Sequence, residues 1–184
     1  MKTQSRMPPI LVLLALLAGC GFHLRGELPG TTQEKTLMMT GAGRGSPLYL
    51  NFTQELTSRG GTVASKAADA SAIINVIKVA HIRRPITLSS SGRANMFDLT
   101  FRVIYEVQTP KGAILIPEKE LEVRREYFNT QGSPLGQGLE EAQLRSEMEK
   151  EASKTLLRQV AIGLRERQEK PAKPDKPEQP AASS

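Results

Sequence analysis

Cysteine and aromatic residues are scarce in this sequence. Its 184 residues include one cysteine, no tryptophan, three tyrosines and five phenylalanines. A single cysteine cannot form a disulfide within the chain, so a folded domain has to be stabilised by its hydrophobic core. Few aromatic side chains leave little surface on which nucleic-acid bases could stack, and we expect no nucleic-acid partner.

Residue patterns typical of enzymes and metal sites are also missing. His23 and His81 are far apart, and no group of Cys, Asp or Glu surrounds them at metal-ligand spacing. No serine lies in a G-x-S-x-G setting, and the glycine-rich residues 41–45 lack the lysine of a P-loop. We therefore expect no metal, no cofactor and no catalytic residue. An enzyme anchored to a membrane is therefore the least favoured functional class.

The longest apolar run lies near the N-terminus and is too short to span a bilayer, which takes roughly 20 residues. Residues 10–17 (ILVLLALL) follow Lys2 and Arg6, a layout typical of a secretory signal. The run ends in L-A-G-C, the cleavage pattern of bacterial lipoproteins. We predict that residues 1–19 are removed between Gly19 and Cys20, and that Cys20 is acylated on its thiol and new amine. Acyl chains at two positions anchor a protein stably in a membrane, whereas a single chain binds only marginally. The alternative is an ordinary signal with a chance cysteine.

The rest of the chain divides by composition into three parts. Residues 20–35 form a polar leader, which we interpret as a tether. Residues 36–167 have the apolar content of one domain. In residues 168–184 a proline recurs every three positions among charged residues, Ala and Ser, so we predict a disordered tail with polyproline character.

Apolar periodicity predicts elements in the order β-α-β-β-β-α. We expect strands at residues 36–40, 73–82, 95–108 and 113–127, helices at 47–59 and 139–167, and a small edge strand at 62–64. Pro85 marks the end or the edge of the second strand, and residues 86–92 form a loop tip. The prediction is a two-layer α+β domain, with a four-stranded, mostly antiparallel sheet and both helices on one face. The first two strands are parallel and the last three form an antiparallel meander.

Two groups of charged residues stand out from this pattern. Arg83, Arg84 and Arg93 flank the predicted loop tip, where they form either a solvated loop or a cluster that pairs with phosphate groups. Glu141, Arg145 and Glu149 interrupt the apolar side of the last helix. We therefore expect that end of the helix to reach beyond the sheet.

The residues after the predicted cleavage site resemble a known family. The stretch Cys20, Gly21, Phe22, His23, Leu24 and Arg25 is similar to the mature N-terminus of the LptE family of LPS-assembly lipoproteins. The element order and the proline-rich tail agree with the same family. Gly21 in place of Asp favours outer-membrane retention under the sorting rule of bacterial lipoproteins.

This resemblance implies a function and a location. It implies a lipid-anchored protein on the periplasmic side of the outer membrane, which sits as a plug in a large β-barrel, LptD, and helps to insert lipopolysaccharide into the outer leaflet. It also implies direct lipopolysaccharide binding by basic residues near the strand loop and the start of the last helix. Arg83, Arg84 and Arg93 are the candidates, and Arg145 lies near the helix start. The alternative is a periplasm-facing lipoprotein scaffold of another outer-membrane assembly complex.

Overall fold

The computed structural model describes residues 36–88, 90, 92–128 and 134–169. The predicted signal peptide (1–19), the leader (20–35) and residues 170–184 of the predicted tail lie outside this part of the chain. So do Gly19, Cys20 and the motif at residues 21–25. No helix in the described ranges is long and apolar enough to cross a membrane.

Five strands form one mixed sheet in the order β2-β1-β3-β4-β5. β1 is parallel to β2 and β3, and β3, β4 and β5 form an antiparallel meander. The bounds are β1 Thr36–Thr40, β2 Thr62–Val63, β3 Ala72–Leu88, β4 Ala94–Gln108 and β5 Ile114–Phe128. The predicted α+β class and strand directions are confirmed. The predicted count of four strands is corrected to five, because the short β2 pairs with β1 and extends the sheet.

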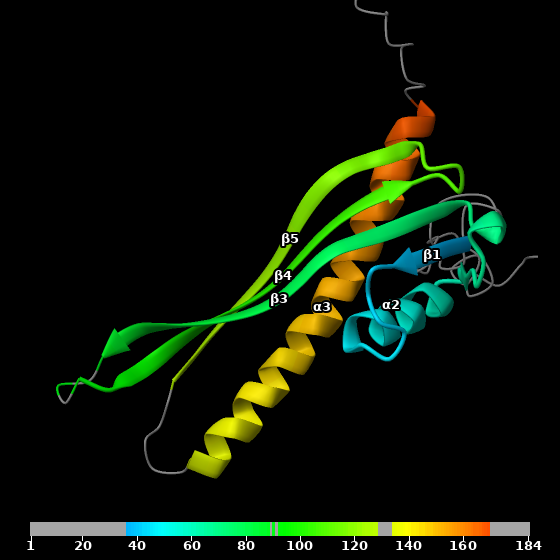
Figure 1. Cartoon of the computed structure of the whole chain (residues 1–184). Coiled ribbons are helices and arrows are strands. Elements are labelled where there is room, and N and C mark those ends of the chain that lie inside the picture. The colour runs from blue at the N-terminus through cyan, green and yellow to red at the C-terminus, as the bar shows by residue number, and fades with distance from the viewer. Residues whose placement is uncertain (1–35, 89, 91, 129–133, 170–184) are drawn as a thin grey trace, which may run out of the picture.

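Two helices pack on the same face of the sheet (Figure 1). α2 (Pro47–Ser58) begins as predicted, because the Ser46 hydroxyl accepts a hydrogen bond from the Tyr49 backbone N–H and Pro47 occupies the first turn. α3 (Pro134–Glu169) is longer at both ends than the predicted 139–167. It includes Gly136 and Gly138. Its last two residues, 168 and 169, belong to the stretch predicted as a disordered tail. A 3-10 turn, Ala67–Asp69, lies before β3.

The main core lies between these helices and the sheet. The apolar stripe predicted on α2 is buried, and so is the middle of the stripe predicted on α3, which includes Met148, Ala152, Leu156 and Val160. Gly163 brings the last part of α3 unusually close to β5, since an added Cβ there would lie 2.6 Å from Cδ1 of Ile116. Burial of these side chains fixes how α3 lies across the sheet.

β3 is longer than the sequence predicts. It continues through Pro85 to Leu88, where a loop was expected, and pairs with β4 over this length. β1 pairs only with residues 72–75 of β3, so the outer side of β3 beyond this point has no strand partner in the described chain. An edge strand tolerates a proline whose nitrogen faces away from its neighbour. The edge reading of Pro85 is therefore confirmed, and the predicted strand end is wrong.

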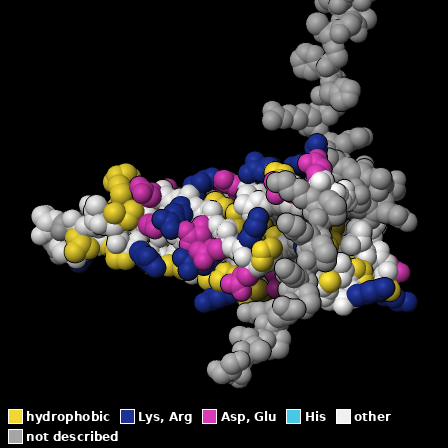
Figure 2. All heavy atoms as spheres, turned by 90° about the horizontal axis from the view of Figure 1, so that it is seen from above, with side chains coloured by type: hydrophobic (Ala, Val, Ile, Leu, Met, Phe, Trp, Pro, Cys, Tyr) yellow, Lys and Arg dark blue, Asp and Glu magenta, His cyan; other side chains and the backbone are white. Residues whose placement is uncertain are grey.

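The extra length of β3 creates an arm. We use this name for residues 78–88 of β3, 94–104 of β4 and 120–128 of β5. Figure 1 shows these three strands running far beyond α2 and β1 to a narrow hairpin end. In Figure 2, basic and acidic side chains are intermixed along the length of the arm. The arm is thus a thin, charged extension of the packed domain.

A β-bulge in β3 decides which side chains of the arm face α3. The register with β4 shifts between Val76 and Lys78, so Ile77 is an extra residue. Before the bulge, Val76 faces the helices. After it, His81 and Arg83 face α3, because they stand opposite the buried Phe101 and Leu99 of β4. We call the other surface of the arm the outer face.

Gly41, at the end of β1, permits the close approach of β1 to β3. Its φ is +78°, and an added Cβ would lie 1.9 Å from the carbonyl oxygen of Val76. Gly41→Ala should lower the free energy of unfolding by roughly 3 kcal/mol, measured by urea denaturation, because it combines a left-handed backbone with a backbone clash. Gly60→Ala is the control, since Gly60 has a similar φ of +75° but open space around it. It should cost only about 1 kcal/mol. Equal losses for the two variants would contradict the close approach.

Candidate functional site

The three predicted lipopolysaccharide contacts do not form one loop cluster. Arg83 and Arg84 are both in β3, where successive side chains point to opposite faces, and Arg93 precedes β4 at the hairpin end. Arg83 faces α3. Arg84 stands beside Asp98 on the outer face and is exposed. The loop placement of Arg83 and Arg84 is therefore wrong, because β3 does not end at Pro85.

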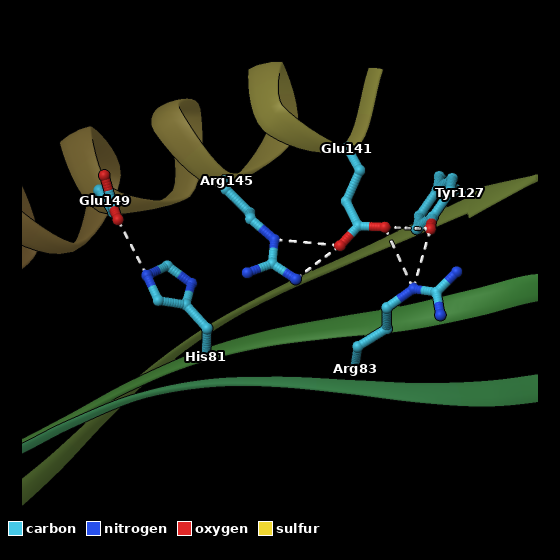
Figure 3. A network of polar contacts seen from close by, with 6 residues as sticks. All are labelled: His81, Arg83, Tyr127, Glu141, Arg145 and Glu149. Atoms are coloured by element: carbon cyan, nitrogen blue, oxygen red, sulfur yellow. Dashed lines mark hydrogen bonds and ion pairs between the residues drawn. The ribbon is translucent and has the colours of Figure 1, made fainter. Parts of the chain in front are cut away.

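Arg83 is held between an aromatic ring and the helix. Its guanidinium carbon lies 3.4 Å from the centre of the Phe97 ring. Its Nε donates a hydrogen bond to the Tyr127 hydroxyl at 3.1 Å and lies 3.1 Å from Oε2 of Glu141 (Figure 3). Stacking on an aromatic face and a planar set of donors are both properties that suit arginine to anion recognition.

Glu141 is the centre of this network. Its Oε1 accepts hydrogen bonds from Nε and Nη2 of Arg145, at 3.1 and 2.5 Å, and its Oε2 accepts one from the Tyr127 hydroxyl at 2.5 Å. Burial alone would raise the pKa of Glu141, but the hydrogen bonds from Tyr127 and Arg145 outweigh it and hold this pKa below its ordinary value. Burial, followed by the bond to Glu141, raises the pKa of Tyr127. Glu141 is therefore a carboxylate held in its charged form.

Two further pairs join α3 to the arm. His81 Nε2 lies 2.8 Å from Glu149 Oε1, and its ring centre is 4.5 Å from that of Phe101. Arg125 pairs with Glu151. We call this set of contacts the helix–arm seam: His81, Arg83, Arg125 and Tyr127 on the arm, with Glu141, Arg145, Glu149 and Glu151 on α3. The charged residues that interrupt the apolar side of α3 thus face the arm, and the expectation that this end passes beyond the sheet is wrong.

The outer face carries a ladder of opposite charges. Arg102 pairs with Glu120 at 3.0 Å and with Glu122 at 2.5 Å, and Arg124 pairs with Glu122 at 2.5 Å. Hydrogen bonds first from Arg124 and then from Arg102 lower the pKa of Glu122 to about 2. The middle of the outer face is thus polar, and its charges are neutralised by their own pairs.

Comparison with known proteins identifies the family. A family model for LptE, described as "Lipopolysaccharide-assembly", matches residues 33–160. This match covers β1 to β5, α2 and most of α3. The chain belongs to the LptE family. The assignment rests on the folded domain, because the matched residues begin after the Cys20–Arg25 motif.

Curated LptE relatives match over most of the chain. The "LPS-assembly lipoprotein LptE" of Photorhabdus laumondii is 26% identical over 159 residues, which cover 85% of this chain and 86% of the relative. The protein of the same name from Yersinia pestis is 27% identical over 160 residues, which cover 85% of this chain and 76% of the relative. The LptE family is named for an assembly process and not for a chemical reaction.

Solved structures share the fold. An uncharacterized lipoprotein B from Nitrosomonas europaea has a TM-score of 0.65 and 28% identity, covering 79% of this chain and 96% of that one. The rare lipoprotein B from Shewanella oneidensis has a TM-score of 0.61 and 20% identity, covering 69% of this chain and 94% of that one. The second likeness concerns the fold alone.

The charge ladder makes the stability of this LptE protein depend on pH. The pKa of Glu122 is about 2 when folded and ordinarily 4.5, so its carboxylate stabilises the fold above pH 4.5. This contribution should fall as the pH decreases from 4.5 toward 2. Glu122→Gln should therefore lower the urea midpoint clearly at pH 6 and much less at pH 2.5.

Glu126→Gln is the control for this measurement. Glu126 lies on the same strand and outer face, and no ion pair involves it within the described residues. Its substitution should change the midpoint little at either pH. A Glu122→Gln effect of the same size at pH 6 and pH 2.5 would rule out ionisation of Glu122 as the cause.

Proposed function

We propose that this chain is the lipoprotein subunit of a lipopolysaccharide export complex in the outer membrane. In this complex it acts as plug and assembly partner of an LptD-type β-barrel, and binds lipopolysaccharide for insertion into the outer leaflet. The observation that carries the proposal is the LptE family match over residues 33–160. The names of the curated relatives, which include both "LPS-assembly" and "lipoprotein", support it.

The anchor proposed for this role is Cys20. Residues 1–19 have the layout of a lipoprotein signal, and Cys20 follows Gly19 at its end. Acylation at Cys20 and retention signalled by Gly21 would hold the domain on the periplasmic side of the outer membrane. The residues before β1 then serve as a tether between membrane and domain.

The outer face of the arm supports the plug role. The interiors of large barrels are polar, so a plug has to present polar groups that need not be buried alone. Arg102, Glu122 and Arg124 present such groups as pairs that already neutralise one another. The charges of these three residues can enter a polar lumen as pairs that are already neutralised.

The end of the arm supports lipopolysaccharide binding. Arg84 and Arg93 lie there, and guanidinium groups bind phosphate well. Ile86, Leu88 and Phe128 are exposed close to them, with 45%, 64% and 62% of their surface accessible. Basic and apolar groups at one end of the arm match an anionic lipid with acyl chains. Arg83, Arg84 and Arg93 therefore stay our candidates for its phosphate groups.

The partner can be tested by affinity purification. The full-length protein with a C-terminal tag, extracted from native membranes in mild detergent, should co-purify with a large β-barrel protein in stoichiometric amount. A tagged unrelated outer-membrane lipoprotein is the control. Recovery of the tagged chain without a barrel, or with a different assembly complex, would replace the proposal by the scaffold alternative.

The anchor can be tested by mass measurement. Protein isolated from native membranes should lack residues 1–19 and carry the mass of diacylglycerol and one further acyl chain on Cys20. Cys20→Ala should carry no acyl mass, because it has no thiol to accept the diacylglycerol. Intact mass spectrometry of both proteins checks this. Cleavage at another position, or an unmodified Cys20, would contradict the proposed anchor.

A further inference from the structure

We propose that β3, between Lys78 and Arg84, is a docking site for one extended, acidic strand of a partner protein. The added strand lies beside β3, on the side turned away from β4, which we call the open edge. This inference goes beyond the proposed function, because the ligand is a polypeptide and backbone groups bind it. It requires neither the membrane anchor nor lipopolysaccharide.

The first argument is the open edge itself. β1 ends at Thr40 and pairs with β3 only as far as Asn75. Figure 1 shows β3 continuing along the arm beyond the end of β1. From Lys78 to Arg84, β3 pairs with β4 without a register shift, and no described strand pairs with its open edge. A regular stretch of strand is thus available on one side.

The second argument is the direction of the backbone groups. In an antiparallel pair, the N–H and C=O of successive residues face alternately toward the neighbouring strand and away from it. An added Cβ on Gly41 would lie 1.9 Å from the carbonyl oxygen of Val76, so Val76 faces the side of β1. The bulge then sets two residues, 77 and 78, opposite one residue of β4. The direction away from β4 therefore returns at Val79.

The same period continues through His81 and Arg83 to Pro85. Proline has no N–H to donate, and an edge strand accepts it where its nitrogen is turned away from the neighbouring strand. Pro85 therefore agrees with the direction deduced from Val76. Val79, His81 and Arg83 each turn one N–H and one C=O toward the open edge, and an added strand can pair with all of these groups.

The third argument is the apolar surface beside the open edge. The side chains of Ile77 and Val79 are 48% and 42% exposed. Val79 stands opposite the buried Val103 of β4, so it lies on the helix side of the sheet. A β-branched side chain of the added strand, placed opposite Val79, would cover part of this surface. Burial of apolar area would then favour the pairing.

The fourth argument is charge, which identifies the occupant. β3 contains Lys78, Arg83 and Arg84 and no acidic residue. Arg83 is paired with Glu141, whereas Lys78 and Arg84 make no ion pair within the described residues. Both of these cations lie on the outer face, because they stand opposite the outward residues 104 and 98 of β4. An added strand with one carboxylate opposite each cation would neutralise both.

A second copy of this chain does not fit the same edge. Antiparallel pairing of two β3 strands about His81 would set Lys78 of one copy opposite Arg84 of the other. Like charges directly opposite one another destabilise a strand pair. Basic residues commonly protect an exposed edge strand against such self-pairing. The same residues attract an acidic strand.

A synthetic peptide tests the open edge. The probe spans the length of β3 from Lys78 to Arg84, with Glu at both ends, Val next to each Glu and Thr between them. It reads the same in both directions, so it can pair in parallel or antiparallel orientation. The full-length protein in detergent is titrated with the fluorescent probe at low ionic strength, and anisotropy is measured. The probe should bind about tenfold more tightly than a twin with Lys in place of Glu. Equal affinities would overturn the proposal.

N-methylation of the probe separates strand pairing from charge attraction. In antiparallel pairing, its second and fourth N–H groups face β3. In parallel pairing, its third and fifth N–H groups do so. Methylation of one of these two sets should abolish binding, and methylation of the other should change the affinity less than about twofold. Equal effects of the two sets would overturn the proposal.

Lys78→Glu is the matched variant of the protein. It should weaken binding of the acidic probe about tenfold and strengthen binding of the Lys twin, because it replaces an attraction by a repulsion. Lys111→Glu is the control. Lys111 is exposed in the turn between β4 and β5 and makes no ion pair within the described residues. Its substitution should change either affinity less than about twofold. Equal weakening by both variants would show general charge attraction and overturn the proposal.

Hydrogen exchange measured by NMR shows which backbone groups are occupied. In the free protein, the N–H groups of Val79, His81 and Arg83 should exchange fast, and those of Ala80 and Ile82 slowly, because the latter face β4. The probe should slow exchange of the first three. Fast exchange that persists at saturating probe would overturn the proposal.

The same measurement identifies other occupants of the open edge. Slow exchange of these three N–H groups in the free protein, dependent on protein concentration, would show that a second copy covers the edge. Slow exchange at every concentration would show that another segment of this chain covers it. Either result would overturn the proposal. Neither would affect the proposed role in lipopolysaccharide export, which the affinity purification tests separately.

Discussion

The pairing of β3 with β4 is the interaction on which the rest of this LptE structure depends. The two strands pair from Ile73 opposite Gln108 to Leu88 opposite Ala94, with register shifts between these ends. Their first part is buried under both helices, and their last part stands out as the arm. β4 supplies the alternation that makes this possible, because its inward residues are apolar from Phe97 to Val107 and its outward residues are mostly polar. β5 then follows β4 and completes the arm.

The bulge at Ile77 turns this pairing into two chemically different faces. If Ile77 were paired regularly and formed no bulge, the two-residue period from Val76 would point Lys78 and Arg84 at α3. Because of the bulge, His81 and Arg83 meet the carboxylates of the helix. The helix–arm seam is therefore polar, with Arg83 and His81 packed on the rings of Phe97 and Phe101. The core between α2, α3 and the sheet is apolar. The bulge at Ile77 thus lies between the apolar core and the polar helix–arm seam.

The sequence predicts the regular parts of the fold well, and the reasons are visible in particular residues. Ser46 and Pro47 mark the start of α2, and the alternation of β4 is unbroken. The length of β3 is harder to predict. Residues 80–88 do not alternate between apolar and polar, and Pro85 indicates the end of a strand when the neighbouring strand is not known. The interruptions in α3 at Glu141 and Arg145 were visible in the sequence. Their meaning was not, because it depends on Arg83 arriving opposite them through a strand extension and a bulge.

The contact between Gly163 and Ile116 gives α3 a mechanical property. The helix lies very close to β5 there, and Glu141 lies roughly 33 Å away along its axis. Gly163 thus contributes one contact point near the end of a long, stiff helix. A tilt of about 5° around it would move the Glu141 end by roughly 3 Å, about the length of a hydrogen bond. A small change in the packing of Gly163 against Ile116 can therefore make or break the contacts between Glu141 and the arm.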